Sequence, residues 1–472
     1  MRFYNTLTKT VQSFAPLSDD NVRMYSCGPT VYDHIHIGNL ASFIYADTLR
    51  RVLSAAGYRV DHVMNFTDVD DKTIKRSHEQ SPSLDPKEAL TKLTREYEVM
   101  FLDDMALIGN DVEAITFVRA TDTIEQMQEL ITQLYDQGFA YIADDGVYFS
   151  IAAYKESGKT YGQLAHIDSD NTSKARINND EYDKASVHDF ALWKLQKDQE
   201  PAWEFELDNQ QLDGRPGWHI ECSVMSTMKL GQPFDIHTGG VDLIFPHHEN
   251  EIAQSTAVTD DPMYAKLFFH NEHLLVDGKK MSKSLQNFYT LDDIVSKGFD
   301  PLAFRLMVLQ SHYRKPVNFT WESLESAQNL LDNLRNWAVL RWQSLPEPSE
   351  TNDTVVTELG KGVAMAVGSD LNIAQCLALI HDLADYTSEQ GLPKAQLEDA
   401  LGSVDNLLGL DLLKQPDITK DQKGLLKERE VARDNKDFAK ADELRAALLA
   451  EGIAINDTPH GQIWSRVRVA SS

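Results

Sequence analysis

The stretch Cys27–Asn39, which reads CGPTVYDHIHIGN, decides the fold because of what stands on either side of it. The apolar run at residues 22–26 predicts a strand, and the apolar periodicity of residues 40–56 predicts a helix. A glycine-bearing loop between a strand and a helix is typical of the phosphate-binding turn of open α/β sheets. The sequence therefore predicts an α/β protein whose functional site lies at this turn.

A second strand is expected at residues 58–66, directly after the first helix, and it completes a βαβ unit with a right-handed crossover. The sequence TDVDDK follows at residues 67–72 and places a carboxylate-rich loop beside the first turn. Two interpretations of its acids stay open: a role in the site, or a solvated helix N-terminus, where negative charge is favoured. The acids concerned are Asp68, Asp70 and Asp71.

Beyond residue 100 the alternation of strands and helices is interrupted and then resumes. Helical periodicity at residues 122–138 leads to a hairpin pattern at residues 140–150, and a polar, turn-rich stretch follows. We therefore expect an inserted connective segment at about residues 100–212 that splits the sheet domain. Further elements are predicted after it: a turn at Gly214–Gly217, a helix from Trp218, a strand at 234–237, a glycine-rich loop at 238–242, a helix starting at Pro246 and a strand at 266–275.

The patterns divide the chain into three parts. The predicted fold class is α/β, with a Rossmann-like parallel-sheet catalytic domain at residues 1–300 that carries the insertion. Nearly continuous helical periodicity predicts an α-helical bundle at residues 301–410, with Cys376 in its core. Two helices and a short β segment predict a small α+β C-terminal unit at residues 420–472.

Composition limits the classes to which the chain can belong. Of its 472 residues, 42% are hydrophobic and 25% are charged, as in ordinary globular proteins. No apolar run reaches the roughly 18 residues of a membrane span and the first residues lack a signal peptide, so we expect a cytoplasmic protein without a membrane partner. Three cysteines do not make a disulfide framework. The net charge of −28 argues against extensive nucleic-acid contact, but residues 420–472 carry ten Lys or Arg against nine Asp or Glu and permit a local contact.

Side chains able to hold a metal recur at the edges of predicted elements. His247 and Glu251 are four residues apart in a helical pattern and share a face, and His248, three residues before Glu251, is an alternative. Cys27 and Cys222 stand at the ends of other elements. Two thiolates, an imidazole and a carboxylate suit tetrahedral zinc. The spacing matches no compact zinc finger, however, and a surface His–Glu pair is the competing interpretation of the helix.

Two loops offer groups for phosphates. His34, His36 and Gly38 bring hydrogen-bond donors and a close backbone approach to a helix N-terminus. A second, polar loop at residues 277–284 adds mobile positive charge. Two such loops across a crevice suit a nucleoside triphosphate, although the P-loop pattern does not occur in the sequence. The lysines of the second loop, for which a solvated turn is the competing interpretation, are Lys279, Lys280 and Lys283.

Several stretches carry a likeness to a known family. HIGN at residues 36–39 and KMSKS at residues 280–284 resemble, in order and placement, the two signature motifs of class I aminoacyl-tRNA synthetases. Further stretches along the chain, as far as Arg466, resemble the cysteinyl-tRNA synthetase family. The stretches concerned are CGPTVYD at 27–33, NFTDVDDK at 65–72, GRPGWHIECS at 214–223, FDIHTGGVD at 234–242, FPHHENE at 245–251 and DTPHGQIW at 457–464.

The resemblance implies one Zn2+ per chain, held by Cys27, Cys222, His247 and Glu251, and it therefore selects His247 over His248. In the family the metal binds the thiolate of the substrate cysteine. A thiol loses its proton on a metal, whereas a hydroxyl is a poor zinc ligand. Because shape alone separates near-isosteres by only about 1–3 kcal/mol, this bond offers a discrimination against serine that makes editing unnecessary.

The resemblance also assigns roles around the substrates. Thr67, Trp218 and Asp242 are expected to line the amino-acid pocket, with Asp242 facing the substrate ammonium and Trp218 forming an apolar wall. The glycines Gly239 and Gly240 are expected to permit close packing of the nucleotide. ATP, with Mg2+, is expected at His36, Gly38, Asn39, Gly239, Gly240, Lys280 and Lys283, of which His36, Asn39, Lys280 and Lys283 are the expected catalytic residues.

The implied reaction is the ATP-dependent attachment of L-cysteine to tRNA(Cys) through a cysteinyl-adenylate. The cysteine carboxylate attacks the α-phosphate, pyrophosphate leaves, and the terminal ribose hydroxyl of the tRNA then takes the acyl group. No residue is required as a nucleophile, because the protein positions the reactants and stabilises charge. The resemblance further implies a monomer.

Two features depart from the family pattern. Asn39 replaces the second histidine of the usual motif, and an asparagine can donate a hydrogen bond to a phosphate but brings no charge. The stretch WEFELDNQQLDG at residues 203–214 is longer than the usual approach to Gly214, and we expect it to form a surface loop.

The C-terminal part resembles the anticodon-contacting end of the family. Its candidate RNA contacts are basic side chains for phosphates and an aromatic ring for stacking. Solvated helix charges and a core tryptophan are the competing interpretation. The residues concerned are Arg429, Arg433, Lys436 and Trp464.

Three rival functions are open to test. A ligase that joins cysteine to an amino sugar would share the zinc and nucleotide motifs, but residues 420–472 count against it. A catalytically inactive paralogue acting as a binding module would show damaged signature loops, and Asn39 is the one departure there. A generic nucleotide-binding protein is disfavoured because five motifs occur together.

Overall fold

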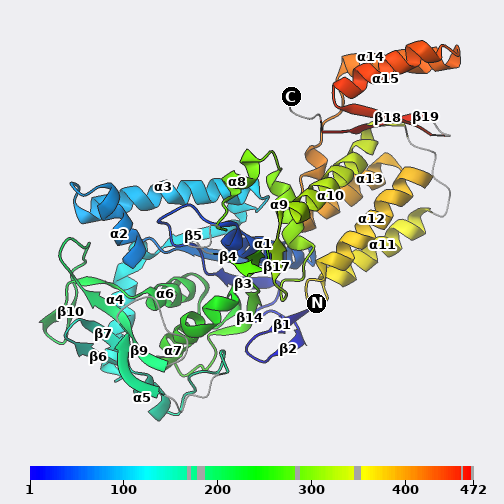
Figure 1. Cartoon of the computed structure of the whole chain (residues 1–472). Helices are drawn as coiled ribbons and strands as arrows, with labels where there is room; N and C mark the ends of the chain where they lie inside the picture. The colour runs from blue at the N-terminus through cyan, green and yellow to red at the C-terminus, as the bar shows by residue number, and fades with distance from the viewer. Residues whose placement is uncertain (167–171, 178–186, 282–286, 345–351, 459–460, 469–472) are drawn as a thin grey trace. The chain divides into compact units, whose positions relative to one another are not determined.

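The computed structural model describes residues 1–166, 172–177, 187–281, 287–344, 352–458 and 461–468. The chain forms two compact units, which are Met1–Asp293 with Tyr313–Asn318, and Ile294–His312 with Phe319–Ser472. Figure 1 shows the elements of both. Among the helices of the described ranges, none combines the length and the apolar character that a membrane crossing requires.

A five-stranded parallel sheet organises the first unit (Figure 1). Its order is β14-β13-β3-β4-β5, so successive strands first extend the sheet on one side of β3 and then on the other. The order reverses between β3 and β13, and ligands of open α/β sheets bind at such a switch point. The predicted Rossmann-like fold class is therefore confirmed. The strands are β3 (Asn21–Ser26), β4 (Arg59–Phe66), β5 (Ile115–Arg119), β13 (Phe234–Gly240) and β14 (Ala265–Asn271).

The helix α1 (Ile37–Ala55) begins earlier than the apolar pattern predicted. The His36 side chain caps it, because its Nδ1 accepts the backbone N–H of Asn39 at 3.2 Å. An N-cap side chain satisfies a backbone donor that the first turn leaves without a partner. A Cβ at Gly38 would lie 2.9 Å from the His36 ring, so glycine at this place lets the ring fold back over the turn.

The acids after β4 fix the start of the next helix, α2 (Asp71–Gln80). Asp70 is its N-cap and accepts the backbone N–H of Thr73 at 2.7 Å. Asp68 accepts two hydrogen bonds from Thr121, from the backbone N at 2.9 Å and from Oγ1 at 2.6 Å. The helix N-terminus interpretation is confirmed for Asp70, but Asp68 and Asp70 are buried rather than solvated.

The inserted segment starts later than residue 100, because Ile115–Arg119 is a strand of the parallel sheet rather than part of the insertion. The insertion carries a mixed sheet, in which β12, β9, β7 and β6 pair antiparallel in that order and β8 pairs parallel with β9. Its predicted hairpin is confirmed as β6 and β7. The strands of this sheet are β6 (Ala140–Ala143), β7 (Gly146–Phe149), β8 (Thr172–Ile177), β9 (Val187–Leu195) and β12 (Gly214–Pro216).

The predicted turn at Gly214–Gly217 is wrong, because Gly214–Pro216 forms the strand β12, paired antiparallel with β9. A Cβ at Gly214 would lie 2.0 Å from the carbonyl oxygen of Lys194. Glycine here serves the close approach of two strands rather than a turn. The long stretch before it forms a small hairpin, β10 (Glu206–Leu207) with β11 (Gln210–Gln211). Asp208 and Asn209 both have positive φ, as a two-residue hairpin turn requires.

The remaining elements of the first unit surround the two sheets. The predicted strand at 266–275 is two strands, β14 and β15, and the predicted glycine-rich loop at 238–242 begins inside β13, which runs to Gly240. The other elements, of which α8 and β17 continue into the second unit, are β1 (Arg2–Asn5), β2 (Thr10–Ser13), α3 (Pro86–Leu107), α4 (Ile124–Asp136), α5 (Ile151–Glu156), α6 (Trp218–Leu230), α7 (Glu249–Ala257), β15 (Leu274–Val276), β16 (Lys279–Lys280), α8 (Leu291–Ser296) and β17 (Val317–Phe319).

The second unit is mostly helical and ends in a two-stranded sheet, so the helices and the terminal β segment predicted after residue 300 are confirmed. Trp464 packs in a small core with residues that include Val339, Leu448 and Ile455. The elements are α9 (Pro301–Leu309), α10 (Trp321–Val339), α11 (Asn352–Val367), α12 (Ile373–Gln390), α13 (Lys394–Leu408), α14 (Lys420–Asp434), α15 (Phe438–Ala450), β18 (Ile453–Thr458) and β19 (Gly461–Arg466).

Candidate metal centre and nucleotide pocket

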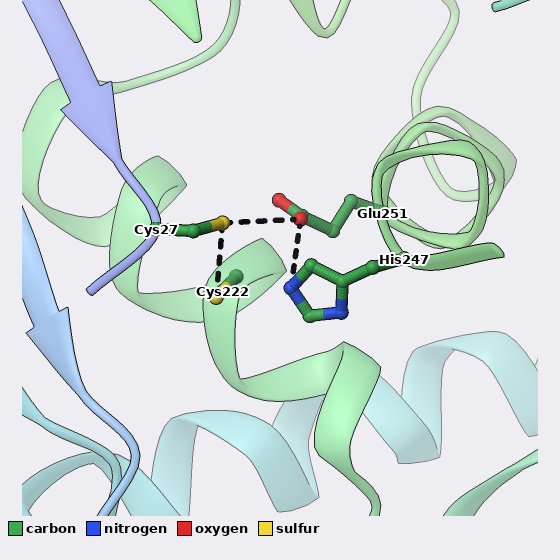
Figure 2. Close-up of side chains that lie close together, drawn as sticks. All are labelled: Cys27, Cys222, His247 and Glu251. Atoms are coloured by element: carbon green, nitrogen blue, oxygen red, sulfur yellow. Dashed lines mark hydrogen bonds and ion pairs between the residues drawn. The ribbon is translucent and has the colours of Figure 1, made fainter. Parts of the chain in front are cut away.

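The structure brings together the four residues that the resemblance proposed as metal ligands. Cys27 follows β3, Cys222 lies on α6, His247 lies on the short π-helical segment Ile244–His248 that leads into α7, and Glu251 lies on α7. One ligand atom from each lies within 4.8 Å of the ligand atoms of the other three. Figure 2 shows the four side chains converging from these separate elements.

The contacts among the four are direct. Cys27 Sγ is 3.8 Å from both Cys222 Sγ and Glu251 Oε1. His247 Nε2 is 3.2 Å from the same Glu251 oxygen. Cys222, His247 and Glu251 are buried, whereas Cys27 is half-buried and lines the neighbouring pocket. The cluster can therefore be reached from the pocket at its Cys27 side.

A second layer of side chains orients the cluster. Glu251 Oε2 accepts hydrogen bonds from His237 Nε2 and from the Tyr264 hydroxyl, each at 2.8 Å, which leaves Oε1 toward Cys27. His219 Nδ1 lies 2.8 Å from His247 Nδ1, so the other ring nitrogen of His247 faces the cluster. Outer partners of this kind fix the direction of metal ligands. His219 and His237 occur within the quoted motifs and Tyr264 lies outside them, and the sequence pattern assigned none of the three a role.

A second possible ligand set overlaps the first and consists of Cys27, His237, His248 and Glu251. His248 Nε2 lies 3.3 Å from Cys27 Sγ, and its Nδ1 lies 2.8 Å from His270 Nε2. The orientation of Glu251 favours the first set, because its Oε1 is 3.2 Å from His247 Nε2 and 3.9 Å from His248 Nε2.

The protonation states suit a metal. Burial lowers the pKa of His247 to about 3, so its imidazole is neutral, which is the form that binds metal ions. Burial, together with hydrogen bonding and charge repulsion from Cys222 and Glu251, raises the pKa of the Cys27 thiol well above its usual value. A divalent cation would reverse that effect and stabilise the thiolates. Two sulfurs, one nitrogen and one oxygen in a buried cluster fit Zn2+.

A pocket of about 350 Å3 lies at the switch point of the sheet. The Trp218 ring stacks on the His247 ring, with centroids 4.2 Å apart, and so joins the pocket wall to the metal cluster. The expected site residues that line this pocket are Cys27, His36, Asn39, Trp218, Gly239, Gly240 and Asp242.

The structure gives Thr67 and Gly239 contacts that differ from their expected roles. Thr67 is buried, and its hydroxyl accepts a hydrogen bond from Asn65 Nδ2 at 3.1 Å. Asn65 Oδ1 accepts the backbone N–H of Gly28 at 2.8 Å, so the pair supports the loop after β3 from behind. The glycine at 239 makes room for protein rather than only for a nucleotide, because a Cβ there would lie 2.9 Å from the His248 ring.

The described part of the second signature stretch, Lys280 and Met281, lies next to the first stretch. The backbone N–H of Ile37 donates to the Tyr289 carbonyl at 2.9 Å, and Asn287 Nδ2 donates to the Lys280 carbonyl at 3.2 Å. The Met281 side chain lies 3.5 Å from the place of a Cβ on Gly38. Lys280 is exposed on β16. Lys283, which was also predicted to belong to this site, falls outside the described residues.

The candidate RNA contacts of the C-terminal part divide into two kinds. Arg429 is buried, and its guanidinium donates to both carboxylate oxygens of Asp457, at 2.9 and 2.8 Å. Arg433 also pairs with Asp457. Trp464 is buried in the core, as its competing interpretation proposed, whereas Lys436 is exposed. A structural role therefore accounts for Arg429 and Trp464.

We predict that Arg429→Met destabilises the C-terminal part by about 2–3 kcal/mol, because it removes the buried guanidinium that bonds both Asp457 oxygens and leaves that carboxylate with Arg433 alone of its two cationic partners. Thermal unfolding measured by calorimetry tests this, with Lys436→Met as the exposed control that should leave the transition in place. If the Arg429→Met protein unfolds at the same temperature as the parent but binds RNA more weakly, Arg429 contacts RNA and its role is not structural.

Two known protein families match the sequence. The family described as "tRNA synthetases class I (C) catalytic domain" matches residues 13–329. The family described as "Cysteinyl-tRNA ligase anticodon binding domain" matches residues 415–464. Together the two matches span the parallel sheet, the insertion and the C-terminal end of the chain.

Curated relatives and solved structures agree with these matches. The cysteine–tRNA ligase of Solibacter usitatus is 39% identical over 99% of both chains, and that of Chlamydia muridarum is 41% identical over 97% of this chain and 98% of its own. The methionyl-tRNA synthetase of Mycobacterium tuberculosis with methionyl-adenylate shares the fold at 13% identity, with a TM-score of 0.60 over 84% of this chain and 93% of its own. The chain therefore belongs to the class I aminoacyl-tRNA synthetases, within the cysteine–tRNA ligase family.

Proposed function

We propose that this chain attaches L-cysteine to tRNA(Cys) in two steps, through a cysteinyl-adenylate, with zinc as the ligand of the substrate thiolate. The observation that carries the proposal is the cluster of Cys27, Cys222, His247 and Glu251 beside the pocket that the HIGN turn also lines. A thiol-binding cluster and a phosphate-binding turn within one pocket suit the cysteinyl-adenylate, which carries both a thiol and a phosphate.

The amino-acid end of the pocket would recognise cysteine in three places. Bound zinc would supply a Lewis acid that takes the substrate sulfur as a thiolate, a form that the hydroxyl of serine does not readily adopt. Trp218, held against His247, provides an apolar wall that keeps water from this end. Asp242 is an exposed carboxylate of the pocket and would accept hydrogen bonds from the substrate ammonium.

The nucleotide end would hold ATP at the start of α1. His36 caps the helix through Nδ1 and also lines the pocket, where its ring would face a phosphate. Asn39 lines the pocket and would donate from its side-chain amide, while Lys280 and Lys283 would bring positive charge, with Mg2+ on the phosphates. The cysteine carboxylate would then attack the α-phosphate in line with the departing pyrophosphate.

The test of the proposal separates the two steps. Cysteine-dependent exchange of pyrophosphate into ATP measures adenylate formation, and transfer of labelled cysteine to tRNA measures the second step. We expect both activities. Exchange without transfer would favour the amino-sugar ligase, and the loss of both from a zinc-loaded protein would favour the inactive paralogue. The monomeric state and the cytoplasmic location stay predictions, which sedimentation and cell fractionation would check.

A further inference from the structure

A buried carboxylate that stands between two of the proposed metal ligands has no role so far. Glu249 is the first residue of α7, and its side chain belongs to a residue that is 1% exposed. In the sequence it lies two residues after His247 and two residues before Glu251. Carboxylates are rarely buried this completely unless hydrogen bonds satisfy them. The hydrogen-bond partners of Glu249 therefore indicate what this side chain holds in place.

Four successive backbone N–H groups of the insertion satisfy the Glu249 carboxylate. Its Oε1 accepts the N–H of Gly162 at 2.7 Å and that of Gln163 at 3.0 Å. Its Oε2 accepts the N–H of Leu164 at 2.8 Å and that of Ala165 at 3.0 Å. Successive N–H groups that converge in this way form an anion-binding concavity of the backbone. Here a carboxylate of the protein itself fills the concavity and joins the insertion to the start of α7.

The loop that donates these bonds, residues 162–165, has a backbone suited to the contact. Gly162 has a φ of 94°, in the left-handed region that favours glycine. Directly before it, the hydroxyl of Tyr161 donates to Asn250 Oδ1 at 2.6 Å, and both of these residues are buried. The loop is therefore tied to two adjacent residues at the start of α7.

Glu249 lies at a junction between two kinds of helix. The π-helical segment Ile244–His248 carries His247 and contains a kink, so it is not a regular continuation of α7. Glu251 lies in the regular helix. Across this junction, His247 Nε2 and Glu251 Oε1 approach to 3.2 Å, as Figure 2 shows. A contact that fixes the residue at the junction therefore fixes the directions of both ligands relative to one another.

We propose that Glu249 is a positioning residue of the metal centre, which uses the loop at residues 162–165 to hold its two neighbouring ligands in the arrangement that binds zinc. The inference rests on the proposed function, because it concerns the site to which that function assigns the substrate sulfur. Glu249 would act through the ligands rather than through a contact with a substrate. Its loss should therefore weaken the binding of zinc and cysteine but not that of ATP, whose proposed place is the start of α1.

The experiment replaces the carboxylate by its amide. Glu249→Gln keeps the shape of the side chain, but the amide nitrogen cannot accept a hydrogen bond, so the backbone donors of one oxygen lose their partner. We expect zinc to bind this variant about ten- to hundredfold more weakly, as measured on the metal-free chain by competition with a chelating dye. In zinc-saturated protein, the KM for cysteine in pyrophosphate exchange should rise about tenfold and the KM for ATP should change less than about twofold. Glu249→Asp keeps the charge and both oxygens, so its zinc affinity should lie between those of Glu249→Gln and the parent.

A second variant breaks the same contact from the side of the loop. Gly162→Ala adds a Cβ where the backbone has a positive φ, so the loop should leave the Glu249 carboxylate. This variant should weaken zinc binding as Glu249→Gln does. The double variant should lose about as much zinc affinity as either single variant, because both changes remove one shared contact.

A control variant separates positioning from a general loss of stability. The Tyr154 hydroxyl on α5 lies 2.7 Å from Thr256 Oγ1 and ties the same insertion to the other end of α7. Tyr154→Phe should lower the unfolding temperature but keep the zinc affinity and the KM for cysteine within about twofold of the parent.

Three results would overturn the inference. These are a parental zinc affinity in Glu249→Gln, an equal loss of zinc affinity in Tyr154→Phe, and full additivity of the changes at Glu249 and Gly162. A parent chain that binds zinc but shows no pyrophosphate exchange would instead overturn the proposed function, and the zinc affinities of the variants would still decide the role of Glu249.

Discussion

Replacement of Cys222 by serine is expected to remove the bound zinc and to lower cysteine-dependent pyrophosphate exchange by about a thousandfold or more. Cys222 lies 1% exposed at the base of the cluster, 3.8 Å from the Cys27 sulfur. A serine hydroxyl there stays protonated and is a weak zinc ligand, so the site loses one of its two thiolates. Zinc content by atomic emission and exchange by isotope incorporation would be measured on the same preparation.

The chain offers a matched control for this change. Cys376→Ser makes the same chemical substitution at the third cysteine, which is buried in α12 of the other unit. That variant should keep one zinc per chain and the exchange activity of the parent. The metal assignment fails if Cys222→Ser also keeps its zinc and its activity.

The second large effect is expected at Asp242. Asp242→Asn should raise the KM for cysteine about thirtyfold, because an amide forms a weaker hydrogen bond with an ammonium than a carboxylate does. Glycine at position 240 leaves room for the Asp242 carboxylate, because a Cβ added there would lie 2.4 Å from Asp242 Oδ1. Steady-state exchange over a range of cysteine concentrations measures the effect.

An analogue without the ammonium makes this prediction specific. 3-Mercaptopropionate keeps the thiol and the carboxylate of cysteine, so its inhibition constant should be nearly the same for the parent and for Asp242→Asn. Asp260→Asn, at an exposed position after α7, is the control and should leave the KM unchanged. A variant that loses affinity for both compounds alike would show that Asp242 supports the pocket rather than meeting the ammonium.

The parts of the fold that the sequence predicted are those in which one segment buries a regular face. Strand β3 alternates buried Val22 and Met24, and its end is buried on both faces, so its apolar run was visible in the sequence. Strand β5 was missed because it has only five residues and two of them, Ile115 and Val118, are buried. The start of α1 was missed because a histidine caps it, and histidine is not among the preferred N-cap residues.

The site shows where a single sequence stops being informative. Spacing placed a histidine and Glu251 on one helix face but left His247 and His248 as alternatives, and the resemblance made the choice. The arrangement that orients Glu251, through His237 and Tyr264, joins residues from two further strand regions and so leaves no local pattern. Buried polar partners of this kind become visible only when the elements are packed together.

For the C-terminal residues, the structure favours a structural role where the sequence allowed an RNA contact. The sequence pattern of Arg429 suited RNA as well as a protein partner, because charge alone does not say what a side chain faces. Its two hydrogen bonds to Asp457, which lies on β18, decide in favour of a structural role.

The measurement that tests the central claim most directly is the charging of bulk tRNA with labelled cysteine and ATP, beside the same reaction with labelled serine. We predict efficient charging with cysteine and a preference over serine of about ten-thousandfold or more, because sulfur bound to zinc discriminates far better than the 1–3 kcal/mol available from shape. Charging with serine at a rate within about a hundredfold of the rate with cysteine would contradict the account.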